Sequence, residues 1–207
     1  AGLEYNRDNL KDDMWGYNRY TKQTVNIGSA FLQNEWKNEK WSILLGGRLD
    51  KHNLINHVIF SPRANLRFNP SEDINLRLSY SSGFRAPQAF DEDLHIENVG
   101  GTVSMIERAK NLKEEKSQSF SASADMYHRF GAFQVNFLVE GFYTRLSDVF
   151  VLENIGERDG ILIKERRNGS GAKVLGLSME GKMAYLSLFQ LQAGVTLQQS
   201  RYDEPEK

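Results

Sequence analysis

The chain has 207 residues, and its 26 lysines and arginines nearly balance its 27 aspartates and glutamates, which leaves a formal net charge of −1. This balance argues against a general polyanion binder, because nucleic-acid-binding proteins owe most of their affinity to a basic excess. Hydrophobic residues make up 40% and charged residues 26%, as in a globular chain. Cysteine is absent, which excludes disulfide frameworks, thiolate metal sites and cysteine nucleophiles.

Apolar and polar residues alternate with a period of two through most of the chain. The alternation predicts an all-β fold of antiparallel, up-and-down strands. In the run 73–83, for example, Ile74, Leu76 and Leu78 alternate with polar residues. Each strand has one apolar and one polar face, as expected where the two faces meet different solvents. Strands are predicted near residues 24–36, 40–51, 62–69, 73–83, 117–129, 133–153, 161–184 and 187–200.

Short and long connections alternate along the chain. Tight turns follow residues 36, 69, 130 and 185, whereas long connections run over 51–61 and 84–116, and a polar hairpin surrounds 156–160. In an up-and-down sheet, all tight turns then lie at one end. Aromatic residues gather at that end, which favours a membrane-interface girdle over ordinary cross-strand pairing. The girdle residues are Trp36, Trp41, Phe68, Phe130, Phe133, Tyr185 and Phe189.

Two classes of protein remain open on composition alone. No stretch approaches the roughly 18 apolar residues of a transmembrane helix, and the first residues lack the basic and apolar regions of a secretory leader. A soluble or surface-attached β-domain that acts in adhesion or protein binding fits these facts. A transmembrane β-barrel fits them equally, because its strands alternate outward apolar and inward polar residues.

The longest loop contains a segment with a different periodicity. Met105, Ile106, Ala109 and Leu112 recur at helical spacing. We therefore expect a short amphipathic helix there. Loops longer than about 15 residues are uncommon unless they are functional or disordered, so this loop is predicted to be functional.

Several motifs resemble a known family. Ser61–Leu66 reads Ser-Pro-Arg-Ala-Asn-Leu, and Leu76–Pro87 ends in Gly-Phe-Arg-Ala-Pro, as in the barrel of TonB-dependent outer-membrane receptors. Gly46–Asp50 and Val174–Glu180 resemble two further strands of that barrel. Asn111–Phe120 resembles the family's return from a long loop into the next strand. Glu114 stands there where proline is common, which predicts a less rigid loop exit.

The resemblance implies a fragment of a transmembrane β-barrel. Residues 1–207 would form a partial barrel domain of about nine strands, with a long external loop at 84–116. The last residues, 202–207, look like an external loop cut short. The family's N-terminal plug, its TonB box and most of its 22 strands would lie outside this chain.

The same resemblance implies a function in the outer membrane. The parent protein is expected to bind a scarce nutrient for TonB-energised uptake, with ferric siderophore, haem and cobalamin as the candidates. Its partners would be that small molecule, the plug, TonB and outer-membrane lipid, but not nucleic acid. No cofactor is implied. The motifs of common nucleotide, zinc-protease and serine-hydrolase sites are absent, so we expect no enzyme.

Candidate site residues fall mainly in the long loops. Ligand binding is assigned to acidic and histidine residues there, because carboxylates recognise cations and imidazole binds haem or metals. The alternative is that these side chains are solvated and bind no ligand. These candidates are Asp91, Glu92, Asp93, His95, His52 and His57. A structural motif at the strand exit comprises Gly83, Phe84, Arg85, Ala86 and Pro87, in which the arginine organises the exit through hydrogen bonds. The inward faces are expected to carry residues that contact the plug and have no partner in this chain, namely Arg48, Arg63, Arg67, Arg77, Glu140 and Glu180.

Overall fold

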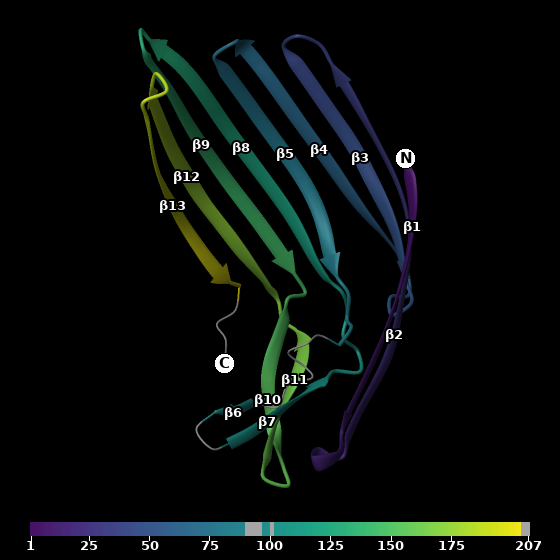
Figure 1. Ribbon diagram of the computed structural model, residues 1–207. Helices are drawn as coiled ribbons and strands as arrows, with labels where there is room; N and C mark the ends of the chain where they lie inside the picture. The colour runs from purple at the N-terminus through teal and green to yellow at the C-terminus, as the bar shows by residue number, and fades with distance from the viewer. Residues whose placement is uncertain (90–96, 100–101, 204–207) are drawn as a thin grey trace.

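The computed structural model describes residues 1–89, 97–99 and 102–203, and these form two sheets (Figure 1). The larger sheet has nine strands in the order β1-β2-β3-β4-β5-β8-β9-β12-β13, and every neighbouring pair is antiparallel. The smaller sheet has four strands in the order β10-β11-β7-β6 and lies at the end where the long connections leave the large sheet. The predicted all-β, up-and-down fold is confirmed.

The strand bounds follow the predicted pattern with two differences. The large sheet contains β1 (Gly2–Met14), β2 (Arg19–Lys37), β3 (Trp41–His52), β4 (Val58–Ser71), β5 (Ile74–Arg85), β8 (Glu115–Phe130), β9 (Phe133–Ser147), β12 (Gly171–Tyr185) and β13 (Phe189–Tyr202). The sequence did not predict β1. It also predicted continuous strands over 133–153 and 161–184, which are wrong: the chain leaves the large sheet after Ser147 and rejoins it at Gly171.

The excursion from the large sheet builds most of the small one. The small sheet consists of β6 (Glu97–Val99), β7 (Thr102–Arg108), β10 (Phe150–Arg158) and β11 (Ile161–Asn168), of which β10 and β11 belong to this excursion. In the large sheet, the 3-10 turn η1 (Trp15–Tyr17) joins β1 to β2. Asp148, with φ +54°, adopts the left-handed conformation at the point where β9 ends. That conformation interrupts the ladder and separates β9 from β10.

The predicted helix near residues 105–112 is wrong, because Met105 and Ile106 lie in β7. β7 pairs in parallel with β11, so that Met105 lies opposite Ile163 and Ile106 opposite Lys164. Ser104 and Ile106 are buried, in agreement with a period of two. The backbone N–H and C=O groups of this segment are thus satisfied by pairing with β11, more than fifty residues away in the chain, and not by hydrogen bonds within a helix.

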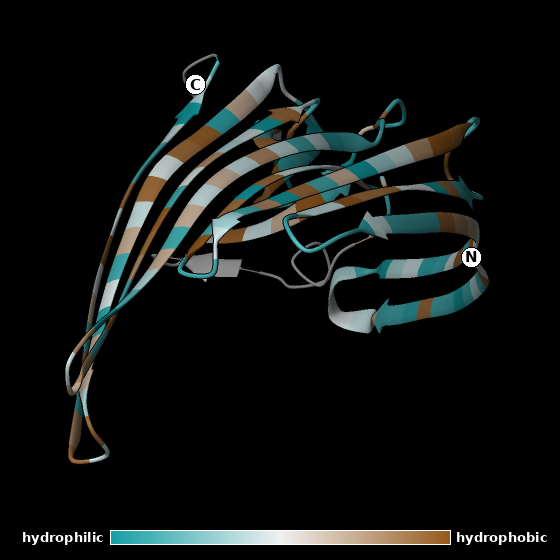
Figure 2. Cartoon of the chain, turned by 90° about the horizontal axis from the view of Figure 1, so that it is seen from above, coloured by the Kyte–Doolittle hydropathy of each residue, from teal (hydrophilic) through white to brown (hydrophobic). Residues whose placement is uncertain are grey.

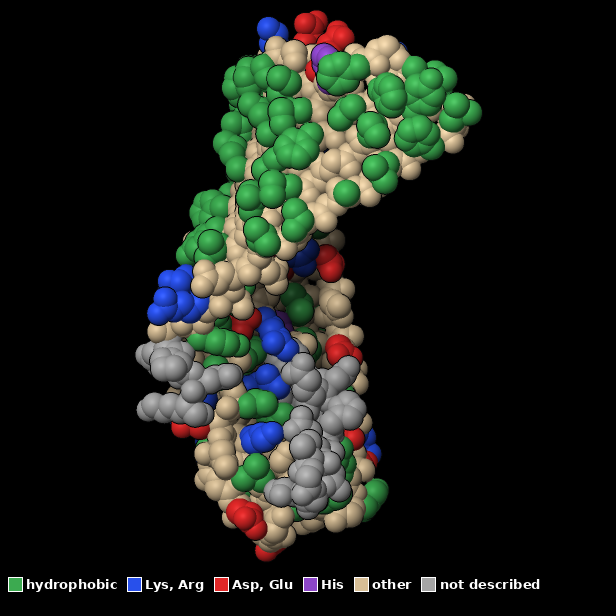
Figure 3. Space-filling model, turned by 90° about the vertical axis from the view of Figure 1, so that its left-hand side faces the viewer, with side chains coloured by type: hydrophobic (Ala, Val, Ile, Leu, Met, Phe, Trp, Pro, Cys, Tyr) green, Lys and Arg blue, Asp and Glu red, His purple; other side chains and the backbone are tan. Residues whose placement is uncertain are grey.

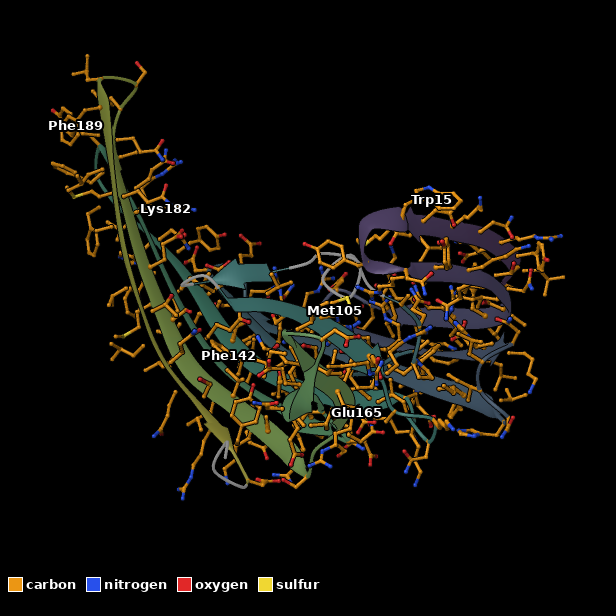
Figure 4. The ribbon with its side chains drawn as sticks, turned by 90° about the horizontal axis from the view of Figure 1, so that it is seen from below. Trp15, Met105, Phe142, Glu165, Lys182 and Phe189 are labelled. Carbon is orange, nitrogen blue, oxygen red and sulfur yellow. The ribbon has the colours of Figure 1, made fainter. Side chains whose placement is uncertain are left out.

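The two faces of the large sheet differ as a barrel wall requires. Along β3, Trp41, Ile43 and Leu45 are exposed on the outer face, whereas Ser42 and Asp50 on the other face are buried. Figure 2 shows the same alternation as bands of hydrophobic and hydrophilic residues along each strand. Figure 4 shows Phe189 on the convex side of the sheet and Lys182 on the concave side. Apolar residues therefore face outward and polar residues face the concave interior.

The aromatic residues at the tight turns meet one another across strands. Trp41 and Phe68 stack with ring centroids 4.1 Å apart, and Tyr185 lies 4.7 Å from Phe133 and 5.8 Å from Phe189. In the described part of the chain, no helix is long and apolar enough to cross a membrane. The aromatic rings occupy one rim of the sheet, and the long connections occupy the other.

Candidate functional site

The exit of β5 turns across the neighbouring strands. Ala86 is buried with Ile55 and Ile59, and Phe84 packs against this cluster. The backbone N–H of Ala89 then donates to Gln23 Oε1 in β2 at 2.8 Å. We call residues 86–89 the strap, because they tie the end of β5 to β2 above the apolar cluster.

Arg85 and its neighbours connect the strand exit to the small sheet. The guanidinium carbon of Arg85 lies 5.5 Å from the ring centroid of Phe150, the first residue of β10. The backbone N–H of Phe150 donates to Glu115 Oε2 at 2.9 Å, and Glu115 is paired with Arg85 across β5 and β8. The Gly83, Phe84, Arg85, Ala86 and Pro87 segment therefore lies where the large sheet meets the small one.

His52 lies in this junction. Its side chain is only 1% exposed, and its Nδ1 accepts a hydrogen bond from the backbone N–H of Leu54 at 3.0 Å. Burial lowers the pKa of His52, and the Gln88 side chain offsets only part of that effect. A neutral, buried imidazole supports the loop that follows β3, and the surrounding protein shields it from a ligand.

His57 reaches a different partner. Its Nε2 lies 3.1 Å from Glu114 Oε1, which also lies 3.1 Å from Lys116 Nζ. The Glu114 side chain is 8% exposed, whereas those of His57 and Lys116 are about half exposed. Burial alone would raise the pKa of Glu114, but hydrogen bonds from its own backbone N–H and from Lys116 outweigh it and lower the pKa. In place of the family's proline, a buried carboxylate joins two long connections.

The remaining predicted ligand-binding residues, Asp91, Glu92, Asp93 and His95, lie outside the described residues. Two asparagines that the sequence did not single out for this purpose hold the connections in place. Asn168 accepts from the N–H of Lys113 at 2.8 Å and donates to the carbonyls of Lys113 and Asp148 at 3.1 and 2.8 Å. Asn53 likewise bonds to β2 at Asn26 and Thr24, each at 2.9 Å.

A cavity of about 540 Å³ lies between the tip of the β1–β2 hairpin and the small sheet. We call it the mouth cavity. Figure 4 shows Trp15 at the hairpin tip and Met105 on the small sheet, and Figure 1 shows that the hairpin tip and β7 lie at the end of the molecule opposite the tight turns. The side chains that line it include Tyr17, Arg19, Tyr20, Ala89, Met105, Glu107, Arg108, Arg158 and Asp159. It therefore combines the hairpin, the strap and the predicted functional loop.

The lining of the mouth cavity favours an anionic ligand. Arg19 Nη2 donates to the carbonyl of Ile106 at 3.2 Å, which joins the hairpin to β7, and Arg158 Nη1 donates to Glu107 Oε1 at 3.1 Å. Three arginines face two carboxylates there, so the formal charge is positive. Guanidinium groups bind anionic oxygens through paired N–H donors and stack on aromatic rings. Among residues 1–89, 97–99 and 102–203, no cluster of three or more His, Asp or Glu is placed to hold a metal ion.

The concave face carries the predicted inward charges, several of which have partners within the chain. Arg48 bonds to Asp50 at 2.8 Å and to Glu4 at 2.9 Å. Arg77 donates to Asn75 at 2.7 Å, and Glu180 pairs with Lys182 at 2.6 Å. The expectation that these charges lack partners in this chain is therefore wrong for Arg48, Arg77 and Glu180. Arg48 binds carboxylates of β3 and β1, whereas Arg77 binds an amide and Glu180 binds a lysine on its own strand.

The model of the TonB dependent receptor-like, β-barrel family matches residues 1–206. The chain belongs to this family. The comparison with curated proteins gave no significant match. Family membership confirms the resemblance seen in the Phe-Arg-Ala-Pro segment and agrees with the outward apolar face of the sheet.

Solved structures share the fold of this receptor-barrel chain. The siderophore receptor PirA from Pseudomonas aeruginosa is 17% identical, with a TM-score of 0.80 over 97% of this chain and 39% of its own. A ferric enterobactin receptor (PfeA) mutant from the same organism is 17% identical, with a TM-score of 0.68 over 95% of this chain and 32% of its own. The FrpB iron transporter from Neisseria meningitidis is 16% identical, with a TM-score of 0.65 over 87% and 27%. The chain thus spans less than two fifths of the length of these receptors.

Proposed function

We propose that this chain is part of the barrel wall of an outer-membrane receptor that binds a ferric siderophore and imports it with energy supplied through TonB. Family membership supports the receptor class. The names of the solved relatives, a siderophore receptor, a ferric enterobactin receptor and an iron transporter, favour iron as the cargo. In this proposal the concave face contacts a plug domain, the convex face contacts lipid, and the long connections face outward.

The mouth cavity is the observation that carries the choice of ligand. Ferric siderophores of the catecholate class are anionic and present aromatic rings. Arginine donors beside tyrosine rings are suited to both properties, because a guanidinium can bond to the oxygens while a ring stacks on a ring. Haem, which is also planar and anionic, is the second candidate that this lining would accept, whereas cobalamin lacks the negative charge.

We further propose a division of roles among the predicted site residues. Asp91, Glu92, Asp93, His95 and His57 stay assigned to ligand contact or to the access path, since they belong to the long connections. His52 would have a structural role and would not contact the ligand. It is buried next to Gln88 of the strap, and its Nδ1 accepts a hydrogen bond from Leu54 in the connection that leads to His57.

Arg108 provides a direct test of the ligand assignment. It lines the mouth cavity and is partly buried at the end of β7. In the purified full-length receptor, Arg108→Gln should weaken binding of ferric enterobactin about 10-fold or more, because a hydrogen bond to a charged group contributes about 1.5–3 kcal/mol. The matched control is Arg129→Gln, an exposed arginine at the tight-turn end, which should leave the affinity unchanged. Equal affinities of Arg108→Gln and wild type for both ferric enterobactin and haemin would reject the cavity as the ligand site.

Uptake tests the transport part separately. Cells that carry the full-length receptor should accumulate iron from ferric enterobactin only when TonB is present. Accumulation that is independent of TonB would contradict the proposed energy source without affecting the binding result.

A further inference from the structure

Three basic residues lie side by side on the outer face of the sheet. Lys173 in β12 is directly opposite Arg145 in β9 on one side and Arg201 in β13 on the other. Residues directly opposite one another in a sheet point to the same face. Like charges in this arrangement destabilise a sheet unless an opposite charge compensates them. We call these residues the basic row.

Asp203 supplies a counter-charge to the basic row. Asp203 accepts hydrogen bonds from Arg145 Nη1 at 2.9 Å and from Nη2 at 2.5 Å. Within the described residues, neither Lys173 nor Arg201 takes part in an ion pair, and Arg201 is exposed. Among the described residues, these two positive charges of the row are not neutralised.

The level of the row along the strands identifies the surroundings. Twelve residues of β12 separate Lys173 from the aromatic rim at Tyr185. At about 3.3 Å per residue and a strand tilt of about 40°, this corresponds to about 30 Å along the barrel axis. The lipid-facing band of such barrels is about 25 Å tall. The basic row thus lies just beyond the apolar band, on the side of the long connections.

The surface between the row and the aromatic rim is apolar. Leu175 and Leu177 in β12 and Leu197 in β13 are 44%, 39% and 61% exposed on this face. Figure 3 shows hydrophobic side chains over the upper half of this side of the molecule, with Lys and Arg side chains directly beneath them.

An apolar groove adjoins the row. It has a volume of about 850 Å³ and begins at Tyr143 and Leu175, which lie two residues from Arg145 and Lys173 on the same face. It continues across the sheet to Leu78 and Ile43. A charged row at one end of an apolar groove matches a molecule with an anionic head and hydrocarbon chains.

We propose that the basic row binds the phosphate group of an outer-leaflet lipid, whose acyl chains lie in the adjoining apolar groove. Arg201 offers a phosphate two parallel N–H donors, and Lys173 adds a compact positive charge between the two arginines. A lipid phosphate fits the position because the row faces the membrane and lies at the level of the headgroups. Occupancy would offset the repulsion within the row.

The test uses the full-length receptor in detergent, with diphosphoryl lipid A as the probe and native mass spectrometry as the measurement. The double variant Lys173→Gln, Arg201→Gln should bind the lipid roughly 30-fold more weakly, because each basic residue near a charged membrane surface contributes about 1 kcal/mol. The matched control is Lys37→Gln, Lys40→Gln, which removes two exposed lysines at the tight-turn end. The control should bind as wild type does, and ligand affinity for ferric enterobactin should be the same in all three proteins.

Each other outcome overturns the proposal. Equal loss in the two double variants would show a general charge effect. Wild-type affinity in Lys173→Gln, Arg201→Gln, or undiminished binding of dephosphorylated lipid A, would show that the row does not recognise the phosphate. Displacement of the lipid by millimolar inorganic phosphate alone would assign the row to free phosphate.

Discussion

Glu114 allows a prediction whose size follows from the geometry. Glu114→Gln keeps the shape of the side chain and removes the charge that lies 3.1 Å from both His57 and Lys116. Removing one partner of a fully buried ion pair costs about 3–5 kcal/mol, whereas exposed pairs contribute about 0–1 kcal/mol. Glu114 is buried but its partners are half exposed, so we expect a local cost of about 1–2 kcal/mol. This cost should appear as opening of the two connections and not as unfolding of the barrel.

Hydrogen exchange on the full-length receptor measures this opening. A cost of about 1–2 kcal/mol corresponds to exchange about 5- to 30-fold faster at the amides of residues 53–57 and 112–116. The pKa of Glu114 is lowered in the folded protein. Its contribution is therefore present above the usual carboxyl pKa of about 4.3 and is lost as the pH falls through the lower folded value. Glu157→Gln, in the exposed β10–β11 hairpin, serves as the control. Unchanged exchange in Glu114→Gln would refute the linking role of this carboxylate.

Two further predictions test the packing described above. Because burial lowers the pKa of His52, the strap should be stable at neutral pH and should open as the pH falls from about 6.5 through the lower folded pKa. Hydrogen exchange at residues 86–89 should therefore be faster near pH 5.5, and this acceleration should disappear in His52→Leu and persist in His57→Gln. An identical acid response in His52→Leu and wild type would contradict the prediction. A Cβ added at Gly47 would lie 2.6 Å from the Phe60 ring, so Gly47→Val should destabilise the barrel by about 1–3 kcal/mol. Phe60→Ala should relieve part of that cost in the double variant. If the effects of the two substitutions on thermal unfolding were strictly additive, the Phe60 ring would not occupy this space.

Much of the large sheet could be predicted because most of its strands have one apolar and one polar face. Each alternating run reports a strand whose outward residues are apolar, and this was sufficient for the strands from β2 to β5 and for β8 and β13. β1 escaped because Gly2–Met14 is polar on both faces, and it forms by pairing along its whole length with a β2 that extends back to Arg19. A strand that is stabilised mainly by backbone hydrogen bonds to its neighbour shows no alternation of apolar and polar residues, so the sequence pattern does not indicate it.

The small sheet and the junction were less accessible from sequence for a different reason. β7 depends on a parallel partner far along the chain, and its apolar residues fit a helical spacing as well as a strand spacing. Asp148 alone, through its left-handed backbone conformation, ends β9. His52 is buried and interacts with Gln88 of the strap, and Asn168 acts through three hydrogen bonds to other segments. Each of these features arises from tertiary contacts that a local pattern does not contain.

The central claim is that the long connections form the ligand site on a barrel wall that stands without them. Deletion of residues 91–111 from the full-length receptor tests it most directly, with equilibrium titration of ferric enterobactin as the measurement and heat-modifiable mobility as the check that the barrel has folded. The deletion removes β7 and with it one side of the mouth cavity. Our account predicts a folded receptor that has lost ferric enterobactin binding. A folded receptor with unchanged affinity would contradict it.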